Sequence, residues 1–185
     1  MWHRAGEEID IVVTHLEMTA RPRFPHPPVP SGPVSALVAA EAPPVWYFLA
    51  LYEAVGAEYE WTDQHYRPRD ELAAFLGDPA VRLYTLMRAG WPHGFFVLDA
   101  SDGTTVDLAY FGLVPQAIGQ GLGWFLLGTA VHAAWDLPGT AKLTVNTNSL
   151  DHPRALPLYQ KAGFVPVRRE NQRRTLTRDR NHVGA

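Results

Sequence analysis

The chain has 185 residues, which fits one domain better than two, and its 46% hydrophobic and 19% charged residues exclude a wholly disordered chain. Its formal charge of −3 lacks the basic field that sequence-independent nucleic-acid binding needs, so we expect no nucleic-acid partner. The absence of cysteine excludes disulfide bonds, thiolate nucleophiles and Cys-rich zinc sites.

No uninterrupted apolar run approaches the roughly 18 residues of a membrane helix, and residues 1–8 lack the basic and then apolar order of an export signal. We therefore expect a cytoplasmic protein without a membrane partner. A homodimer is the assembly to test, because homodimers are the commonest assembly of soluble proteins.

The first half of the chain predicts one strand, one long loop and two helices. β-branched residues favour a strand over Ile9–Leu16. Eight of the sixteen prolines lie between Pro22 and Pro44, so we expect an extended surface loop there, and the best candidate for a mobile region. Apolar residues at helical spacing predict helices over Val45–Ala54 and Arg69–Leu76.

The second half begins with an antiparallel meander. Strand patterns cover Val81–Arg88, His93–Leu98 and Thr105–Leu113, with turn residues between them. A helix is predicted over Leu122–Trp135, where the sequence is rich in leucine, alanine and aromatic residues.

Strands and helices then alternate to the end of the chain. We expect a strand over Lys142–Thr147, a helix over Pro153–Ala162 and a strand over Phe164–Arg168. The tail from Arg168 to Arg180 holds six arginines and predicts either a terminal hairpin or a frayed end, with the arginines in solvent. The alternation favours mixed α/β packing around one sheet.

A glycine-rich turn joins a predicted strand to the helix at Leu122. Gly119, Gly121 and Gly123 let the backbone approach a ligand, and the first N–H groups of the helix favour an anion such as a pyrophosphate. The alternative interpretation is a purely structural turn, in which the glycines only bring a strand close to a helix. Leu126 stands where a Rossmann motif has its third glycine, and no Gly-Lys-Ser/Thr follows, so neither nucleotide motif is present.

Two segments resemble the GCN5-related N-acetyltransferase (GNAT) superfamily. Its pyrophosphate motif, Q/R-x-x-G-x-G/A, is similar to Ile118–Gly123, with isoleucine in the first position. Its second motif, A-x-x-L-Y-x-K-x-G-F, is similar to Ala155–Phe164, with His152 in place of the usual upstream asparagine. Together the motifs span residues 104–167.

The resemblance implies one acyltransferase domain over residues 1–185, with 22–44 as a surface loop and 169–185 as a tail. The implied fold class is α/β (α+β): a mixed, mostly antiparallel central sheet of about six or seven strands flanked by about four helices. The fourth and fifth strands, here Thr105–Leu113 and Lys142–Thr147, are expected to splay apart and hold the pantetheine arm.

The implied cofactor is acetyl-CoA, without a metal, and the eight histidines show no H-E-x-x-H spacing. The resemblance assigns main-chain contacts with pantetheine to Leu113 and Val114. The phosphate cradle that it implies consists of Ile118, Gly119, Gln120, Gly121, Leu122, Gly123 and Trp124.

Tyr159 matches the family tyrosine beside the thioester sulfur, where its hydroxyl protonates the leaving group; the structural alternative is a core tyrosine. Asp107 is the candidate base, on a face shared with Leu113 unless a bulge shifts the alternation, and its alternative is a solvated strand residue. Glu58, Glu60 and Asp63 are candidates for binding the acceptor amine, against a solvated acidic loop.

The expected function is transfer of an acetyl group from acetyl-CoA to a primary amine of a small molecule or a protein. A second hypothesis is a catalytically silent acyl-CoA-binding module, and a third is a nucleotide-binding protein. The acceptor cannot be read from the sequence, because one fold serves many acceptors.

Overall fold

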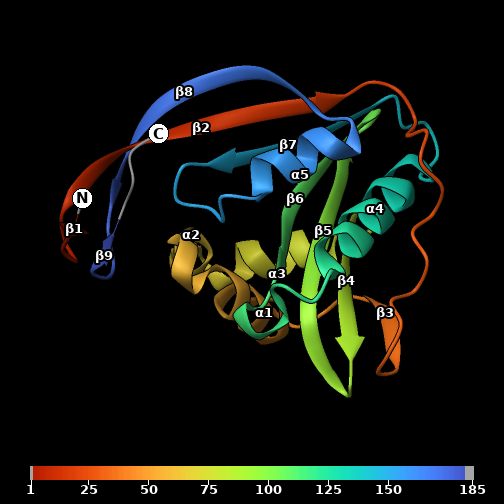
Figure 1. The fold of residues 1–185 in the computed structure, drawn as a ribbon, viewed down its shortest axis with the longest axis horizontal. Coiled ribbons are helices and arrows are strands. Elements are labelled where there is room, and N and C mark those ends of the chain that lie inside the picture. Colours follow the sequence, from red (N-terminus) through yellow and green to blue (C-terminus); the bar gives the residue numbers. More distant parts are fainter. Residues whose placement is uncertain (1, 182–185) are drawn as a thin grey trace.

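The computed structural model describes residues 2–181 as a seven-stranded sheet flanked by helices (Figure 1). The strand order is β3-β4-β5-β6-β7-β2-β8, and every neighbouring pair is antiparallel except β6 and β7. Its strands are β2 (Glu8–Met18), β3 (Ser35–Ala40), β4 (Val81–Arg88), β5 (Trp91–Asp102), β6 (Thr105–Leu113), β7 (Lys142–Asn148) and β8 (Val165–Thr175). The strands β1 (Trp2–His3) and β9 (Arg180–Asn181) form a separate two-stranded sheet.

The helices form two groups, which Figure 1 shows apart from each other. One group is α1 (Val45–Gly56), α2 (Asp63–Tyr66) and α3 (Arg69–Gly77); the other is α4 (Leu122–Trp135) and α5 (Ala155–Ala162). Short 3-10 turns, η1 (Ala57–Tyr59) and η2 (Pro115–Ala117), follow α1 and β6. In residues 2–181, no helix has both the length and the apolar character that crossing a membrane requires.

The core lies between the sheet and these helices. Helix α4 packs against β5, β6 and β7, and α1 packs against β5 and β6. Phe48 of α1, Phe95 and Phe96 of β5, and Leu126 of α4 are fully buried. Burial of such side chains contributes roughly 1.5–3 kcal/mol each, so this layer holds the sheet and helices together.

The expected fold class is confirmed, and several predicted elements have the expected bounds. The strands at Val81–Arg88 and Thr105–Leu113 and the helix at Leu122–Trp135 begin and end at the predicted residues. The strand predicted at Ile9–Leu16 is longer, running over Glu8–Met18, because both of its edges are paired.

The proline-rich segment differs from the expected loop. Ser35–Ala40, between Pro33 and Pro43, forms an edge strand against β4, since these six residues contain no proline and can supply their N–H groups to the ladder. Upstream, the Phe24 ring lies 4.9 Å from Trp124 and 5.2 Å from His132, both on α4. The segment is therefore a strap packed along α4.

We expect Gly128→Ala to displace this strap. A Cβ at position 128 would lie 2.5 Å from Pro27 Cγ and 3.4 Å from the Phe24 ring, so Pro27 must shift. Overpacking costs about 1–3 kcal/mol and exceeds the gain in helix propensity of about 1 kcal/mol. Thermal melting should fall, and limited proteolysis near Pro27 should speed up.

Gly123→Ala is the matched control, because a Cβ there meets only Leu158 and Leu113, at ordinary contact distances of 3.6 Å and 4.0 Å. It should melt at or above the wild-type temperature. Equal destabilisation by the two variants would contradict the packing argument.

The arginine-rich tail is neither an isolated hairpin nor a frayed end up to Thr175. It continues β8, whose residues pair with β2 from Glu8 to Glu17 across one bulge. Arg173 lies near Glu8 and Asp10, so opposite charges on neighbouring strands support the pairing. Part of the predicted tail, residues 182–185, lies outside the described residues.

Candidate active site

Strands β6 and β7 separate soon after they meet, as expected. Their parallel pairing is confined to Thr105 with Lys142, Val106 with Leu143 and Asp107 with Thr144. Beyond that point a cavity of about 730 Å³ opens, lined by β6 from Leu108 to Leu113 and by Val145, Asn146 and Asn148 of β7. The diverging edges leave backbone groups that an extended, amide-bearing ligand can pair with.

One end of the cavity is the glycine turn before α4. Gly119 and Gly121 have φ values of +84° and +76°, and Gly121 is the N-cap of the helix without any side-chain cap. A Cβ built at either position meets nothing within 4 Å, so the turn faces open space. The uncapped N–H groups and the helix dipole together make this end suited to an anion.

Lys161 adds a positive charge at this end. Its Nζ lies 4.6 Å from the centroid of the Trp124 ring, a cation–π contact, and both residues line the cavity. Phe24 of the strap packs on the same Trp124 ring, so the ring is held from one side by the strap.

Of the residues expected to form the cradle, Ile118, Gly119, Gly121, Leu122, Gly123 and Trp124 line the cavity. Gln120 does not; its side-chain amide donates to Gln116 O. Leu113 lines the cavity, whereas Val114 does not. The N–H of Val114 donates to His93 O and its carbonyl accepts from Ala117 N, because the chain turns into η2 there.

Tyr159 lies in the middle of the cavity wall. The residue is 5% exposed, and its ring packs edge-on against Phe111 and Phe164. Burial, followed by the negative charges of Asp151 and Asp107, raises the pKa of Tyr159 above its ordinary value. The hydroxyl therefore stays protonated at neutral pH and is available as a proton donor.

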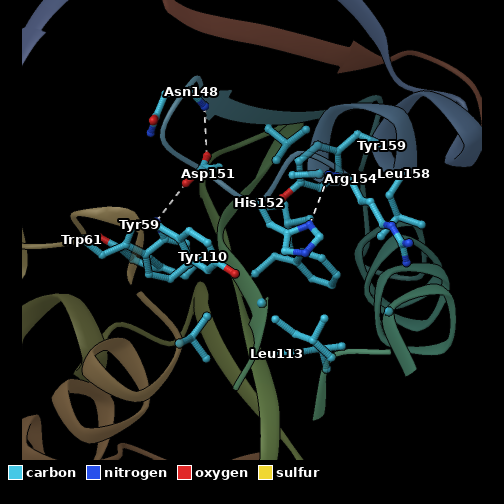
Figure 2. A pocket seen from close by; sticks show the side chains of 18 of the residues that line it. Tyr59, Trp61, Tyr110, Leu113, Asn148, Asp151, His152, Arg154, Leu158 and Tyr159 are labelled. Carbon is cyan, nitrogen blue, oxygen red and sulfur yellow. Dashed lines mark hydrogen bonds between the residues drawn. The ribbon is translucent and has the colours of Figure 1, made fainter. Parts of the chain in front are cut away.

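Asp151 fastens the loop after β7 to the opposite wall. Its Oδ1 accepts from Trp61 Nε1 at 3.2 Å, and its Oδ2 accepts from Thr147 Oγ1 at 2.8 Å and from Asn148 N at 2.9 Å. Figure 2 shows Asp151 between Trp61 on one side and Tyr159 on the other.

His152, which follows Asp151, points into the same space. Its Nδ1 accepts the backbone N–H of Arg154 at 3.1 Å, so in the neutral ring Nε2 carries the hydrogen. The residue therefore presents a donor to the cavity.

The far end of the cavity is aromatic. Tyr52, Tyr59, Trp61 and Tyr110 line it, and Figure 2 shows three of them grouped opposite Tyr159. Burial raises the pKa of Tyr52 to about 12 and also raises the pKa of Tyr110, so both phenols remain neutral.

The three acidic residues expected to bind the acceptor are dispersed. Asp63 lines the cavity but is paired with Arg174, whose Nη1 and Nη2 lie 2.7 and 3.2 Å from its oxygens. Glu58 is exposed and does not line the cavity. Glu60 is 1% exposed, and its Oε2 accepts from the N–H and hydroxyl of Thr177, so it anchors the chain before β9.

Asp107, the expected base, is not among the residues that line this cavity. It lies at the apex where β6 and β7 still pair, accepts a 2.6 Å hydrogen bond from Thr144 Oγ1, and borders a smaller hollow of about 270 Å³. A bulge in the β5–β6 pairing, between Val97 and Leu98, shifts the alternation that placed Asp107 with Leu113. Its role as a base remains a prediction without a contact to support it.

We expect Asp107→Asn to stabilise the protein at neutral pH. Burial raises the pKa of Asp107, which means that folding disfavours its charged form. A raised folded-state pKa gives a stability contribution that is present at acid pH and lost as pH rises through that value. The variant should melt about 2–4 °C higher near pH 7 and gain nothing in acid, as a pH series of melting curves will show.

Turnover of Asp107→Asn should change less than about threefold, because its side chain lies outside the cavity. A loss of turnover of about 100-fold with unchanged CoA affinity would instead support Asp107 as the general base.

The sequence carried no local signal for two parts of the site. Arg174 reaches Asp63 across 111 residues, and Trp61 reaches Asp151 across 90. Such pairs depend on how β8 and the loop after β7 lie beside η1 and α2. Among residues 2–181, no group of three or more acidic and histidine side chains is placed to hold a metal.

The fold combines two parallel strands, β6 and β7, that diverge, with a helix, α4, that begins at a glycine turn. This arrangement is suited to an extended, anionic ligand between the two strands. A model of the acetyltransferase (GNAT) family matches residues 48–164, and the chain belongs to this family. No curated protein matches the chain.

Solved structures share the fold at low identity. One is a tandem GNAT protein from the clavulanic acid biosynthesis pathway (TM-score 0.63, 18% identity, covering 91% of this chain and 53% of that one). Another is a GCN5-related N-acetyltransferase from Kribbella flavida (TM-score 0.57, 19% identity, covering 86% and 56%). A third is an aminoglycoside acetyltransferase from an uncultured soil metagenomic sample (TM-score 0.56, 15% identity, covering 70% and 87%). The chain thus spans little more than half the length of the first two.

Proposed function

We propose that the chain is an N-acetyltransferase that takes acetyl-CoA as donor and a primary amine of a small molecule or protein as acceptor, with both bound at once. The observation that carries this proposal is one continuous cavity with three parts. At one end, the uncapped start of α4 is suited to an anion. The open edges of β6 and β7 lie in the middle. Beyond Tyr159, aromatic rings and carboxylates line the other end.

The residues present fit acetyl-CoA. Gly119 and Gly121 leave open space above the uncapped helix start, where N–H groups can hold a diphosphate. Lys161 lines the same end and contributes a cation. The diverging strand edges suit the two amides of a pantetheine arm.

Bound acetyl-CoA would supply the acetyl group as a thioester. The two walls of the cavity hold the amine nitrogen near the carbonyl carbon, which replaces a collision in solution with a positioned attack. Tyr159, kept protonated by burial, donates its hydrogen to the sulfur as the C–S bond breaks and the C–N bond forms. The nitrogen releases one proton to solvent, and the Tyr159 phenolate takes one proton back from solvent, so the products are an amide and a thiol and Tyr159 is restored.

Two measurements test this function. Calorimetry should detect CoA binding to the purified chain, and an assay of thiol release should show turnover with acetyl-CoA and a panel of primary amines. CoA binding without turnover on any amine would favour a silent acyl-CoA-binding module. Absence of CoA binding by folded protein would overturn the proposal.

A further inference from the structure

At the aromatic end of the cavity, rings that pack on one another form one wall, the box. The centroid of Tyr52 lies 5.5 Å from that of Trp61 and 5.6 Å from that of Tyr110, and the Trp61 and Tyr110 centroids are 6.2 Å apart. Tyr59 lines the same end. Ring faces of this kind pack against flat apolar groups and also attract a cation.

One carboxylate at the edge of the box has no cationic partner within the described part of the chain. The hydrogen bonds of Asp151 come from an indole, a hydroxyl and a backbone N–H, all of them neutral. A carboxylate offers about four acceptor positions, and these bonds occupy three. Asp63, by contrast, is neutralised by both nitrogens of the Arg174 guanidinium.

Asp151 lies where a bound amine would meet the acyl group. Its negative charge contributes to the raised pKa of Tyr59, on the aromatic side, after burial and the charge of Glu58. It also contributes to the raised pKa of Tyr159, on the thioester side, after burial. Its Oδ1 also touches the indole nitrogen of Trp61. An ammonium paired with Asp151 therefore lies between the box and Tyr159.

We infer that the acceptor is a monocationic arylalkylamine: its ammonium pairs with Asp151 and its flat, apolar body packs against the box, on the rings of Tyr59, Trp61 and Tyr110. Tyr52, which is 3% exposed, supports the Trp61 and Tyr110 rings. This deepens the proposed function and rests on it. A polyamine fits poorly, because a second ammonium would meet rings and the Arg174 guanidinium rather than a free carboxylate.

Steady-state kinetics with three probe amines test the acceptor class. The Michaelis constant for 2-phenylethylamine should be about tenfold or more below those for spermidine and for a lysine-containing peptide. Calorimetry on the CoA-bound protein gives a readout without turnover: 2-phenylethylamine should bind, and the uncharged 2-phenylethanol should bind about tenfold or more weakly.

Asp151→Asn tests the ion pair. It should raise the dissociation constant of 2-phenylethylamine about tenfold or more and leave the CoA affinity unchanged. Glu58→Gln is the matched control, because it removes an equal charge near Tyr59 from outside the cavity wall, and it should change binding less than about twofold.

A pair of variants at Tyr59 keeps the inference testable even if Asp151→Asn unfolds. Tyr59→Leu should abolish the preference for 2-phenylethylamine over spermidine, whereas Tyr59→Phe, which keeps the ring, should retain it. Preference of the wild type for spermidine or the peptide, with CoA bound, would overturn this inference alone. Absence of CoA binding would overturn the proposed function instead.

Discussion

Replacing Tyr159 with phenylalanine should lower kcat by about 100-fold while leaving the dissociation constant of CoA unchanged. The phenol is buried, protonated and placed in the wall between the cofactor end and the aromatic end of the cavity. Without its hydrogen the thiolate must leave unprotonated, whereas the ring continues to pack against Phe111 and Phe164. Single-turnover kinetics and calorimetry measure the two quantities separately.

Tyr84→Phe serves as the control for this experiment. Tyr84 lies on β4, stacks on Phe96 at 4.7 Å and does not line the cavity, so its loss of a hydroxyl should leave kcat near the wild-type value. A Tyr159→Phe enzyme with wild-type kcat would show that the hydroxyl is not the proton donor.

The pH profile gives an independent check. Because burial raises the pKa of Tyr159 above its ordinary value of 10.0, the hydroxyl stays protonated throughout the range in which an acceptor amine becomes neutral. Wild-type turnover should therefore rise with pH as the amine loses its proton, and it should not decrease at any pH below about 10. A bell-shaped profile with a descending limb near neutral pH would assign the donor to another group.

Replacing Gly121 with alanine should raise the dissociation constant of CoA about tenfold or more. At φ +76° the residue sits in the left-handed region, and its added Cβ would project into the open space over the helix start. The methyl group thus competes with the diphosphate for that space. The backbone conformation alone adds a stability loss of about 1–2 kcal/mol.

Gly103→Ala separates these two effects. Gly103 has φ +62° in the turn between β5 and β6, and a Cβ there also meets nothing within 4 Å. It should lose similar stability in denaturant titrations and keep wild-type CoA affinity, because it does not line the cavity. Equal losses of CoA affinity in both variants would show that backbone strain, rather than the cradle, controls binding.

Much of the fold follows from local patterns. The helix at Leu122–Trp135 and the strands at Val81–Arg88 and Thr105–Leu113 were predicted with their observed bounds, because turn residues and glycines mark their ends. The sequence also singled out the glycine turn and Tyr159, which line the cavity, since both belong to contiguous motifs.

Non-local pairing accounts for the predictions that were wrong. Ser35–Ala40 is a strand because β4 lies beside it, and β8 extends to Thr175 because β2 supplies a partner along its length. The alternation count that placed Asp107 with Leu113 was wrong because of a bulge in the β5–β6 pairing.

By itself, the sequence determined the order of the strands and α-helices from Val81 to Ala162, the glycine turn at Gly119 and Gly121, and the resemblance to one family, because each depends on residues close together in the chain. Only the tertiary structure decided which acidic residues line the cavity and which of them are neutralised by other side chains. Glu60 is turned inward to Thr177, Asp63 is neutralised by Arg174, and Asp151 is brought to Trp61 from 90 residues away. Charge and hydrogen-bonding partners are supplied by the packing of distant segments, so no local pattern encodes them.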